Sequence, residues 1–424
     1  MTLMEVFFFF FTGRVSWQYI RKLNTLGTVQ RKETLDLTTL QKTVNHYDNS
    51  LLILLFGVVG ILIIAAFVAL YVSNFKTVFR MQQMKEHGEH INTMKEDCRE
   101  LINRKFHVSL LALPVLGVIL VNVIPIIFMI CVAFTNYDMD HQPPTYLFTW
   151  VGLKNFRQLF TSSATVTFGY AFIRILFWTL LWALLATFST YFGGIMLAKL
   201  INDRQVRWKK MWRTLFVITI AIPQFVTLLL VGKMFGDYGI VNSICSKTGL
   251  TDLLRQIGLV GKGLSYIPFL TKPGWAHVMI VLINIWVGVP FQMLSATGIL
   301  MNIPHEQMES AKIDGANERQ IFWKIMMPYM LFVTGPSLLT ALIANINNFN
   351  VIYLLTTDYV TSNYANSNAK EVDLLVTWLF RLTNDYSNYK MASVIGICVF
   401  CICAVLTLIG FTRMIAGNKE EEFQ

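Results

Sequence analysis

The sequence predicts an all-α, polytopic membrane protein, and three observations support this prediction. Hydrophobic residues make up 54% of the 424-residue chain and charged residues only 14%, whereas soluble domains are roughly one quarter charged. Seven apolar stretches are long enough to cross a hydrocarbon core of about 30 Å as helices. Basic residues gather in a few of the segments between these stretches, so the net charge of +10 indicates membrane orientation and not nucleic-acid binding.

The predicted spans follow one another along the chain. They are expected at about 51–73, 108–134, 170–201, 211–236, 275–300, 329–356 and 391–416. Seven basic residues lie in 76–107 and five more lie between 204 and 213. The positive-inside rule places both segments in the cytoplasm, and counting spans then places the C-terminus there too.

The first fifty residues do not fit this orientation. Counting the spans places them outside the cytoplasm, although they are basic. Their basic residues are Arg14, Arg21, Lys22, Arg31, Lys32 and Lys42. The apolar run from Val6 to Phe11 is too short to be a span, since residues 1–11 would cover only about 16 Å as a helix. Two interpretations stay open: the end of an extra N-terminal span that is incomplete, or an anchor lying flat on the membrane.

A polar island between the fifth and sixth spans is the most specific pattern in the chain. Pro304 suits the first position of a helix, and residues 305–313 are predicted to form a short one. Gly315 can take the left-handed conformation that ends it. Asn317 and Gln320 match a capping box that starts a second helix.

We expect Pro328 to close this second helix near the next apolar run. The result is a sharply bent helix pair that carries two acidic residues, Glu309 and Asp314. Such a rigid polar pair suits docking into a groove on another protein.

The island also resembles a known family. Glu309-Ser310-Ala311, Asp314-Gly315-Ala316, Ile325 and Pro328 are similar to the loop of membrane subunits in bacterial ABC importers. The resemblance implies that a coupling loop at about 301–328 sits in a cleft of a cytoplasmic ATPase and transmits its closure to the spans. The coupling residues it implies are Glu309, Ala311, Asp314, Gly315 and Ala316.

Further segments extend the resemblance over about residues 108–416, to the larger membrane subunit of the bacterial maltose transporter. They are Gly152–Phe156, Asn284–Phe291, Asn345–Phe349 and Asp373–Val376. The implied architecture is a six-helix type I ABC importer core within a permease domain at 108–424. An extra N-terminal membrane region with its charged cytoplasmic loop, 1–107, precedes it.

The sequence differs from that subunit in two extracytoplasmic segments. Only residues 135–169 join two spans where the enterobacterial subunit has a large extracytoplasmic domain. Thr357-Asp358-Tyr359 replaces a Gly-Gly-Pro, which alters the outer loop at 357–390.

Polar residues in two later spans predict a binding site for a neutral ligand. Asn345 and Asn348 are expected on one face of one helix, and Asn284, Gly288 and Phe291 share a face of another. Asparagine can pair with sugar hydroxyls, and an aromatic ring can cover the apolar face of a pyranose. The alternative is that these asparagines only join neighbouring helices. The resemblance favours sugar contacts, with Phe291 at a position where the family has a tyrosine.

The function implied is that of a permease subunit of an ATP-driven importer of oligosaccharides, expected to be maltose and maltodextrins. The chain has no Gly-x-x-x-x-Gly-Lys-Ser/Thr motif, so we expect a separate subunit to hydrolyse ATP and this chain not to be an enzyme. The implied partners are a second homologous permease, forming a heterodimer, two ABC ATPase subunits and an extracytoplasmic sugar-binding protein. The expected location is the bacterial plasma membrane, with many spans and a cytoplasmic C-terminus.

Two other classes of protein fit the sequence less well. An ion-coupled secondary transporter of small polar solutes usually needs an ionisable residue at the membrane centre, and the middles of the predicted spans hold none. A membrane-embedded glycosyltransferase would need clustered carboxylates, but those of the 357–390 loop follow no recognisable motif spacing. No cofactor, catalytic residue or metal site is predicted, and Cys398, Cys401 and Cys403 are interpreted as packing residues.

Overall fold

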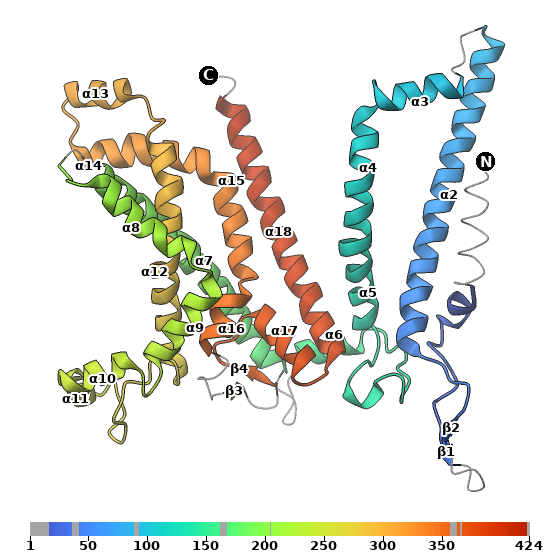
Figure 1. Ribbon diagram of the computed structural model, residues 1–424, viewed down its shortest axis with the longest axis horizontal. Coiled ribbons are helices and arrows are strands. Elements are labelled where there is room, and N and C mark those ends of the chain that lie inside the picture. Colours follow the sequence, from blue (N-terminus) through green and yellow to red (C-terminus); the bar gives the residue numbers. More distant parts are fainter. Residues whose placement is uncertain are drawn as a thin grey trace. The chain divides into compact units, whose positions relative to one another are not determined.

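The computed structural model describes residues 17–35, 42–88, 93–161, 168–203, 205–356, 363–364 and 367–421. Helices dominate this part of the chain, and the strands form two short hairpins, β1–β2 and β3–β4 (Figure 1). The chain forms two compact units. One contains the residues up to 157 together with 386–394, and the other contains 158–385 and the residues from 395 onward. The predicted all-α fold is confirmed.

Seven helical segments of the described chain are long and apolar enough to cross a membrane. They are Ser50–Glu86, Phe106–Ala133, Phe168–Asn202, Gln224–Lys247, Pro273–Leu300, Glu318–Thr356 and Tyr389–Arg413. The number of predicted spans is therefore confirmed, and six lie close to their predicted positions. Val6–Phe11, expected to end a further span, lies outside the described residues.

The first unit is built on an antiparallel hairpin and a long helix. Its elements are β1 (Glu33–Leu35), β2 (Lys42–Val44), α2 (Ser50–Glu86), α3 (Met94–Ile102), α4 (Phe106–Val118), η1 (Ile119–Val123), α5 (Ile124–Ala133), η2 (Met139–His141) and α6 (Lys154–Phe160), which reaches the second unit. Thr34 pairs with Thr43 in the hairpin. Asn49 caps α2 by accepting bonds from the Leu51 and Leu52 amides.

The second unit contains the remaining elements. They are α7 (Phe168–Asn202), α8 (Lys209–Ala221), α9 (Gln224–Phe235), α10 (Ile240–Lys247), α11 (Leu250–Gln256), α12 (Pro273–Leu300), α13 (His305–Ile313), α14 (Glu318–Ile321), η3 (Phe322–Met326), α15 (Met327–Ile346), α16 (Phe349–Thr356), β3 (Asn363–Tyr364), β4 (Ala369–Lys370), α17 (Leu375–Asn384) and α18 (Tyr389–Glu421), which starts in the first unit. In this unit α13 and α14 lie at one end and α10 and α11 at the other (Figure 1).

Close packing of α7 against α12 forms the centre of the second unit. A Cβ added at Gly194 would lie 2.4 Å from the Gln292 Cβ, and one at Gly288 would lie 2.8 Å from a Thr190 methyl. Small residues let two helix backbones approach in this way. Trp182 and Ile280 are fully buried beside this contact.

Single prolines explain two places where the helices differ from the predicted ones. The predicted span 211–236 is wrong as a single helix, because it breaks at Pro223. Ile222, just before it, is extended with φ −83° and ψ 128°, as expected for a residue that precedes proline. The apolar segment identified as a span instead begins at Gln224.

The expectation that Pro328 closes the helix begun at Asn317 is also wrong. Residues 318–346 form one helix, in which a π-helical turn at η3 precedes the proline. The Met327 amide reaches back to the Phe322 carbonyl, and this wider turn accommodates a residue that has no amide hydrogen. The same arrangement precedes Pro125, where the Ile124 amide bonds to the Ile119 carbonyl.

Candidate functional site

Local hydrogen bonds shape the predicted coupling pair, which consists of α13, α14 and the turn between them. α13 ends at Ile313 with Asp314 as its C-cap, and Gly315 has a φ of +82°. The Ala316 amide bonds to the Ala311 carbonyl at 2.9 Å, and the Gly315 amide bonds to the Lys312 carbonyl at 3.1 Å. These two bonds form a Schellman motif. Ala311, Gly315 and Ala316, three of the predicted coupling residues, therefore form the C-terminal end of α13.

The second helix starts with the predicted capping box. The Gln320 amide donates to Asn317 Oδ1, and the Asn317 amide donates to Gln320 Oε1, both at 2.8 Å. Across the turn, Lys312 Nζ lies 2.9 Å from Glu318 Oε1. The Schellman motif and the capping box therefore fix the angle between the two helices, and this exposed ion pair adds little.

The surface of the coupling pair is polar, exposed and hollowed. A hollow of about 530 Å³ lies beside α13 and is lined by Glu306, Gln307, Ser310, Ala311, Asp314 and Ile325. Glu309 is exposed but does not line it, and Ile313 is 86% exposed at the bend. An apolar tip between acidic residues suits insertion into a complementary groove.

A single helix leads from this pair into the apolar part of the unit. Residues 318–346 run without a break through α14, η3 and α15, which corresponds to roughly 43 Å. Near its start, Lys199 Nζ of α7 lies 4.7 Å from the centroid of the Phe322 ring. We call residues 318–346 the coupling helix.

At its far end the coupling helix reaches a hydrogen-bonded group that we call the asparagine cluster: Asn345, Asn348, Thr187 and Trp182. Asn345 Nδ2 donates to Thr187 Oγ1 at 2.9 Å, and Trp182 Nε1 donates to the Asn345 carbonyl at 3.1 Å. Asn348 Nδ2 lies 3.3 Å from Asn345 Oδ1. The cluster therefore ties the end of α15 to α7.

Asn345 and Asn348 meet, but the prediction that one helix carries both is wrong. α15 ends at Ile346, and α16 begins at Phe349. Asn348 Oδ1 accepts a bond from the Val351 amide at 3.3 Å. An asparagine that caps the following helix competes with continuation of the preceding one.

The other three predicted sugar contacts occupy different environments on α12. Asn284 is 8% exposed, and its amide has no hydrogen-bond partner within the described residues. Gly288 lies against Thr190, as required by the close packing of α7 and α12. Phe291 is 61% exposed. Among the described residues, no hydrogen bond joins Asn284 to the asparagine cluster.

Comparisons with known proteins place the chain in a family. The family model described as "Binding-protein-dependent transport system inner membrane component" matches residues 190–415. The chain belongs to this family. It is a multi-pass inner-membrane permease and not an enzyme.

Individual relatives agree with this assignment. The permease is 32% identical to the maltodextrin transport system permease protein MdxF of Bacillus subtilis (strain 168), over 88% of its length and 84% of the relative. It is 29% identical to the galactooligosaccharides transport system permease protein GanP of the same organism, over 88% and 85% of the two chains. The predicted resemblance to permeases of sugar importers is confirmed.

A solved structure shows the same fold. It is described as a crystal structure of a bacterial ABC transporter involved in the import of the acidic polysaccharide alginate. The match has a TM-score of 0.55 and 23% identity, and it covers 76% of the permease and 99% of that chain.

One carboxylate of the 357–390 loop, that of Asp373, serves the fold. Asp373 is fully buried and accepts bonds from Arg381 Nε at 3.3 Å and from an Arg381 terminal nitrogen at 3.2 Å. Thr377 Oγ1 also donates to it, at 3.0 Å. Asp358 lies outside the described residues. A carboxylate held by this buried ion pair is not free for glycosyl transfer.

Sequence reasoning missed the residues of α7 that hold the functional elements in place. Thr187 and Trp182 bind Asn345, and Lys199 packs on Phe322. A signal was present, because Thr179, Thr187 and Thr190 lie within a mostly apolar span at spacings of eight and three. These spacings place them on one stripe of the helix.

Proposed function

We propose that the permease forms part of the translocation path of an ATP-driven importer of maltose and maltodextrins. The observation that carries this proposal is the coupling helix, which joins the exposed coupling pair to the asparagine cluster without a break. A movement imposed on the coupling pair would be transmitted along this rigid element. The maltodextrin relatives, at about 30% identity, support the choice of substrate.

The proposed partners are those implied by the family to which the chain belongs. Two ABC ATPase subunits hydrolyse ATP, and one of them receives α13 and α14 through Glu309, Ala311, Asp314, Gly315 and Ala316. A second homologous permease completes the path as a heterodimer. An extracytoplasmic sugar-binding protein delivers the oligosaccharide.

The proposed sugar contacts are Asn284, Gly288, Phe291, Asn345 and Asn348. Asn284 supports this assignment because its amide is unpaired within the described chain, whereas Gly288 contributes space by letting α7 approach. Each contact is neutral, which suits a neutral ligand that must be released again. Residues 108–424 are assigned to the permease domain and residues 1–107 to the extra N-terminal region.

Orientation is part of the proposal: the coupling pair and the C-terminus are cytoplasmic. Thr34, in β1, then lies outside. A single cysteine at Thr34 should react with an impermeant maleimide in intact cells. Labelling only after the membrane is permeabilised would contradict this orientation.

The function is tested by reconstituting the permease with its partner permease, ATPase and binding protein in proteoliposomes. The proposal expects uptake of radiolabelled maltotriose that requires ATP and that maltodextrins of two to seven units inhibit. Uptake driven by an ion gradient without ATP would instead indicate a secondary transporter. Inhibition by galacto-oligosaccharides and not by maltodextrins would overturn the substrate, and GanP makes that comparison a necessary control.

A further inference from the structure

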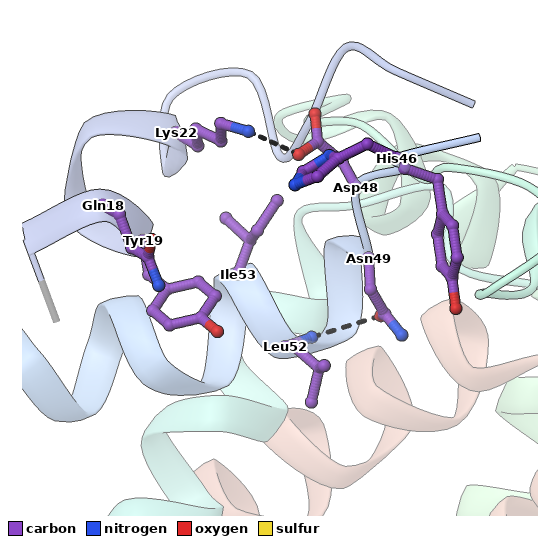
Figure 2. Close-up of a pocket in the computed structure, with 9 residues that line it drawn as sticks. Gln18, Tyr19, Lys22, His46, Asp48, Asn49, Leu52 and Ile53 are labelled. Atoms are coloured by element: carbon purple, nitrogen blue, oxygen red, sulfur yellow. Dashed lines mark hydrogen bonds and ion pairs between the residues drawn. The ribbon is translucent and has the colours of Figure 1, made fainter. Parts of the chain in front are cut away.

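The first unit contains a polar cavity that the proposed transport function does not use. Its volume is about 320 Å³, at the lower end of the ~300–1,000 Å³ typical of small-molecule sites. The helical segment 17–22 forms one wall, residues 46–49 form another, and the first turn of α2 forms the floor. Figure 2 shows the polar side chains of Gln18, Lys22 and His46 around the apolar side chain of Ile53.

A buried carboxylate fixes the walls of this cavity. Asp48 is 5% exposed and accepts bonds from Lys22 Nζ at 2.5 Å, the Thr28 amide at 2.9 Å and the Val29 amide at 3.2 Å. Burial alone would raise the pKa of Asp48, but these hydrogen bonds outweigh it and hold the pKa below its ordinary value. The ammonium and the carboxylate therefore cancel in charge.

Each of two tyrosine rings of the cavity packs against a neighbouring side chain. The Tyr19 ring packs on Phe56 with 5.2 Å between centroids, and the Arg31 guanidinium lies 5.6 Å from the centroid of Tyr47. Both rings line the cavity. Neighbouring side chains thus fix their positions before any ligand arrives, which lowers the entropic cost of binding.

Several polar groups of the lining are free to bind a ligand. Within the described chain the Gln18 amide, the His46 ring and the hydroxyls of Tyr19 and Tyr47 have no hydrogen-bond partner. Together they offer both donors and acceptors. Gln18 and His46 are exposed, so their polar groups can be reached from solvent.

We propose that this cavity binds one pyranose unit of an oligosaccharide. Amide, imidazole and phenol groups match neutral hydroxyls, while Ile53 and the two rings match the apolar face of a sugar. The lining has no net formal charge when His46 is neutral, because Lys22 is paired with Asp48. A phospholipid phosphate would instead require a cation that is not already paired.

The location of this site rests on the proposed orientation, which puts the start of α2 outside. There the cavity would hold an oligosaccharide at the outer face of the first unit. Its affinity for sugar does not depend on whether the second unit transports that sugar.

The test uses the assembled transporter in lipid nanodiscs, without the binding protein, and titrates maltotriose by saturation-transfer NMR. The Asn348→Leu background weakens the proposed membrane site. In this background we expect maltotriose to bind still, and Gln18→Ala with His46→Ala to weaken binding about fivefold or more, since two neutral hydrogen bonds are lost. Gln30→Ala with His107→Ala, two exposed residues outside the cavity, is the matched control.

The outcomes separate this inference from the proposed function. Equal affinity in the cavity and control variants, or no binding in the Asn348→Leu background, would overturn the inference and leave the transport proposal standing. Displacement of maltotriose by glycerol 1-phosphate would identify a lipid-headgroup site and also overturn it. If ATP drives no oligosaccharide uptake but the cavity variant alone loses maltotriose binding, the inference stands and the proposed function fails.

Discussion

The coupling pair and the asparagine cluster lie at opposite ends of one helix, yet different kinds of contact hold them. Bonds between residues three to five apart fix the coupling pair, among them the Ala316 amide to the Ala311 carbonyl. The asparagine cluster depends on α7, because Thr187 and Trp182 are 158 and 163 positions away from Asn345. The first region is exposed, whereas in the second Thr187 and Trp182 are buried and the two asparagines are half-buried.

This difference shows how both ends of the coupling helix can be held by defined contacts in a transporter in which that helix moves. Local bonds keep the coupling pair in shape while its surface stays free for a partner. Tertiary bonds make the environment of Asn345 dependent on the position of α7. A shift of the coupling helix relative to α7 would therefore change the polar groups available to a ligand.

The largest expected effect concerns the local geometry of the coupling pair. Gly315→Leu places a side chain at a φ of +82°, which costs about 1–2 kcal/mol and opposes the Schellman motif. We expect the ATPase to bind about tenfold more weakly, or to be lost on purification, while the permease stays in the membrane. Gly315→Asn is the matched control, because asparagine tolerates this conformation; retention of the ATPase by Gly315→Leu would refute the docking role.

Breaking the tertiary contact should have the next largest effect. Thr187→Val keeps the shape of the side chain but removes the hydroxyl that binds Asn345. Losing this bond costs about 0.5–1.5 kcal/mol, roughly 2- to 13-fold in an equilibrium constant, so we expect the maltotriose uptake rate to fall severalfold with the ATPase still attached. Thr190→Val is the control, since within the described residues its hydroxyl bonds only to backbone carbonyls of its own helix. Equal uptake by the two variants would show that the bond between Thr187 and Asn345 has no role in transport.

Loss of the proposed sugar contact of Asn348 should have an effect of similar size. Asn348→Ala removes one amide, and we expect uptake to fall about 2- to 13-fold. Stimulation of ATP hydrolysis by the loaded binding protein should largely persist, because that signal arrives from outside. Asn348→Leu should be more severe, since it puts an apolar branch where hydroxyls pass. Normal rate and selectivity in Asn348→Ala and Asn345→Ala would mean that these residues only join helices.

Phe291→Ala should have the smallest effect. Its ring is 61% exposed in the chain, so truncation leaves the packing of α12 intact. If the ring covers a single pyranose, short and long maltodextrins should lose uptake to the same extent, by about twofold or more. Competition with maltose and maltoheptaose measures this, and a loss confined to the longer sugar would contradict a single-ring contact.

The same contrast explains what could be predicted from the sequence. Gly315, Asn317 and Gln320 act on neighbours within the chain, and their predicted roles match the turn and caps observed. Pro328 was misjudged because the π-helical turn before it depends on the bond from Met327 to Phe322, which spacing alone does not indicate. The prediction that Asn348 shares a helix with Asn345 is wrong because Asn348 caps α16. The partners of Asn345 on α7 could not be paired with it without the fold.

The measurement that tests the account most directly weakens the coupling helix between its two ends. Trp323→Gly with Lys324→Gly places two poor helix formers, each about 1 kcal/mol worse than alanine, within η3. Trp323→Ala with Lys324→Ala is the control, because it removes the same side chains and favours the helix. In proteoliposomes, the account predicts that the glycine variant keeps its ATPase but imports several times less maltotriose per ATP hydrolysed than the alanine variant. An equal ratio of uptake to hydrolysis in the two variants would contradict the claim that this helix transmits the movement.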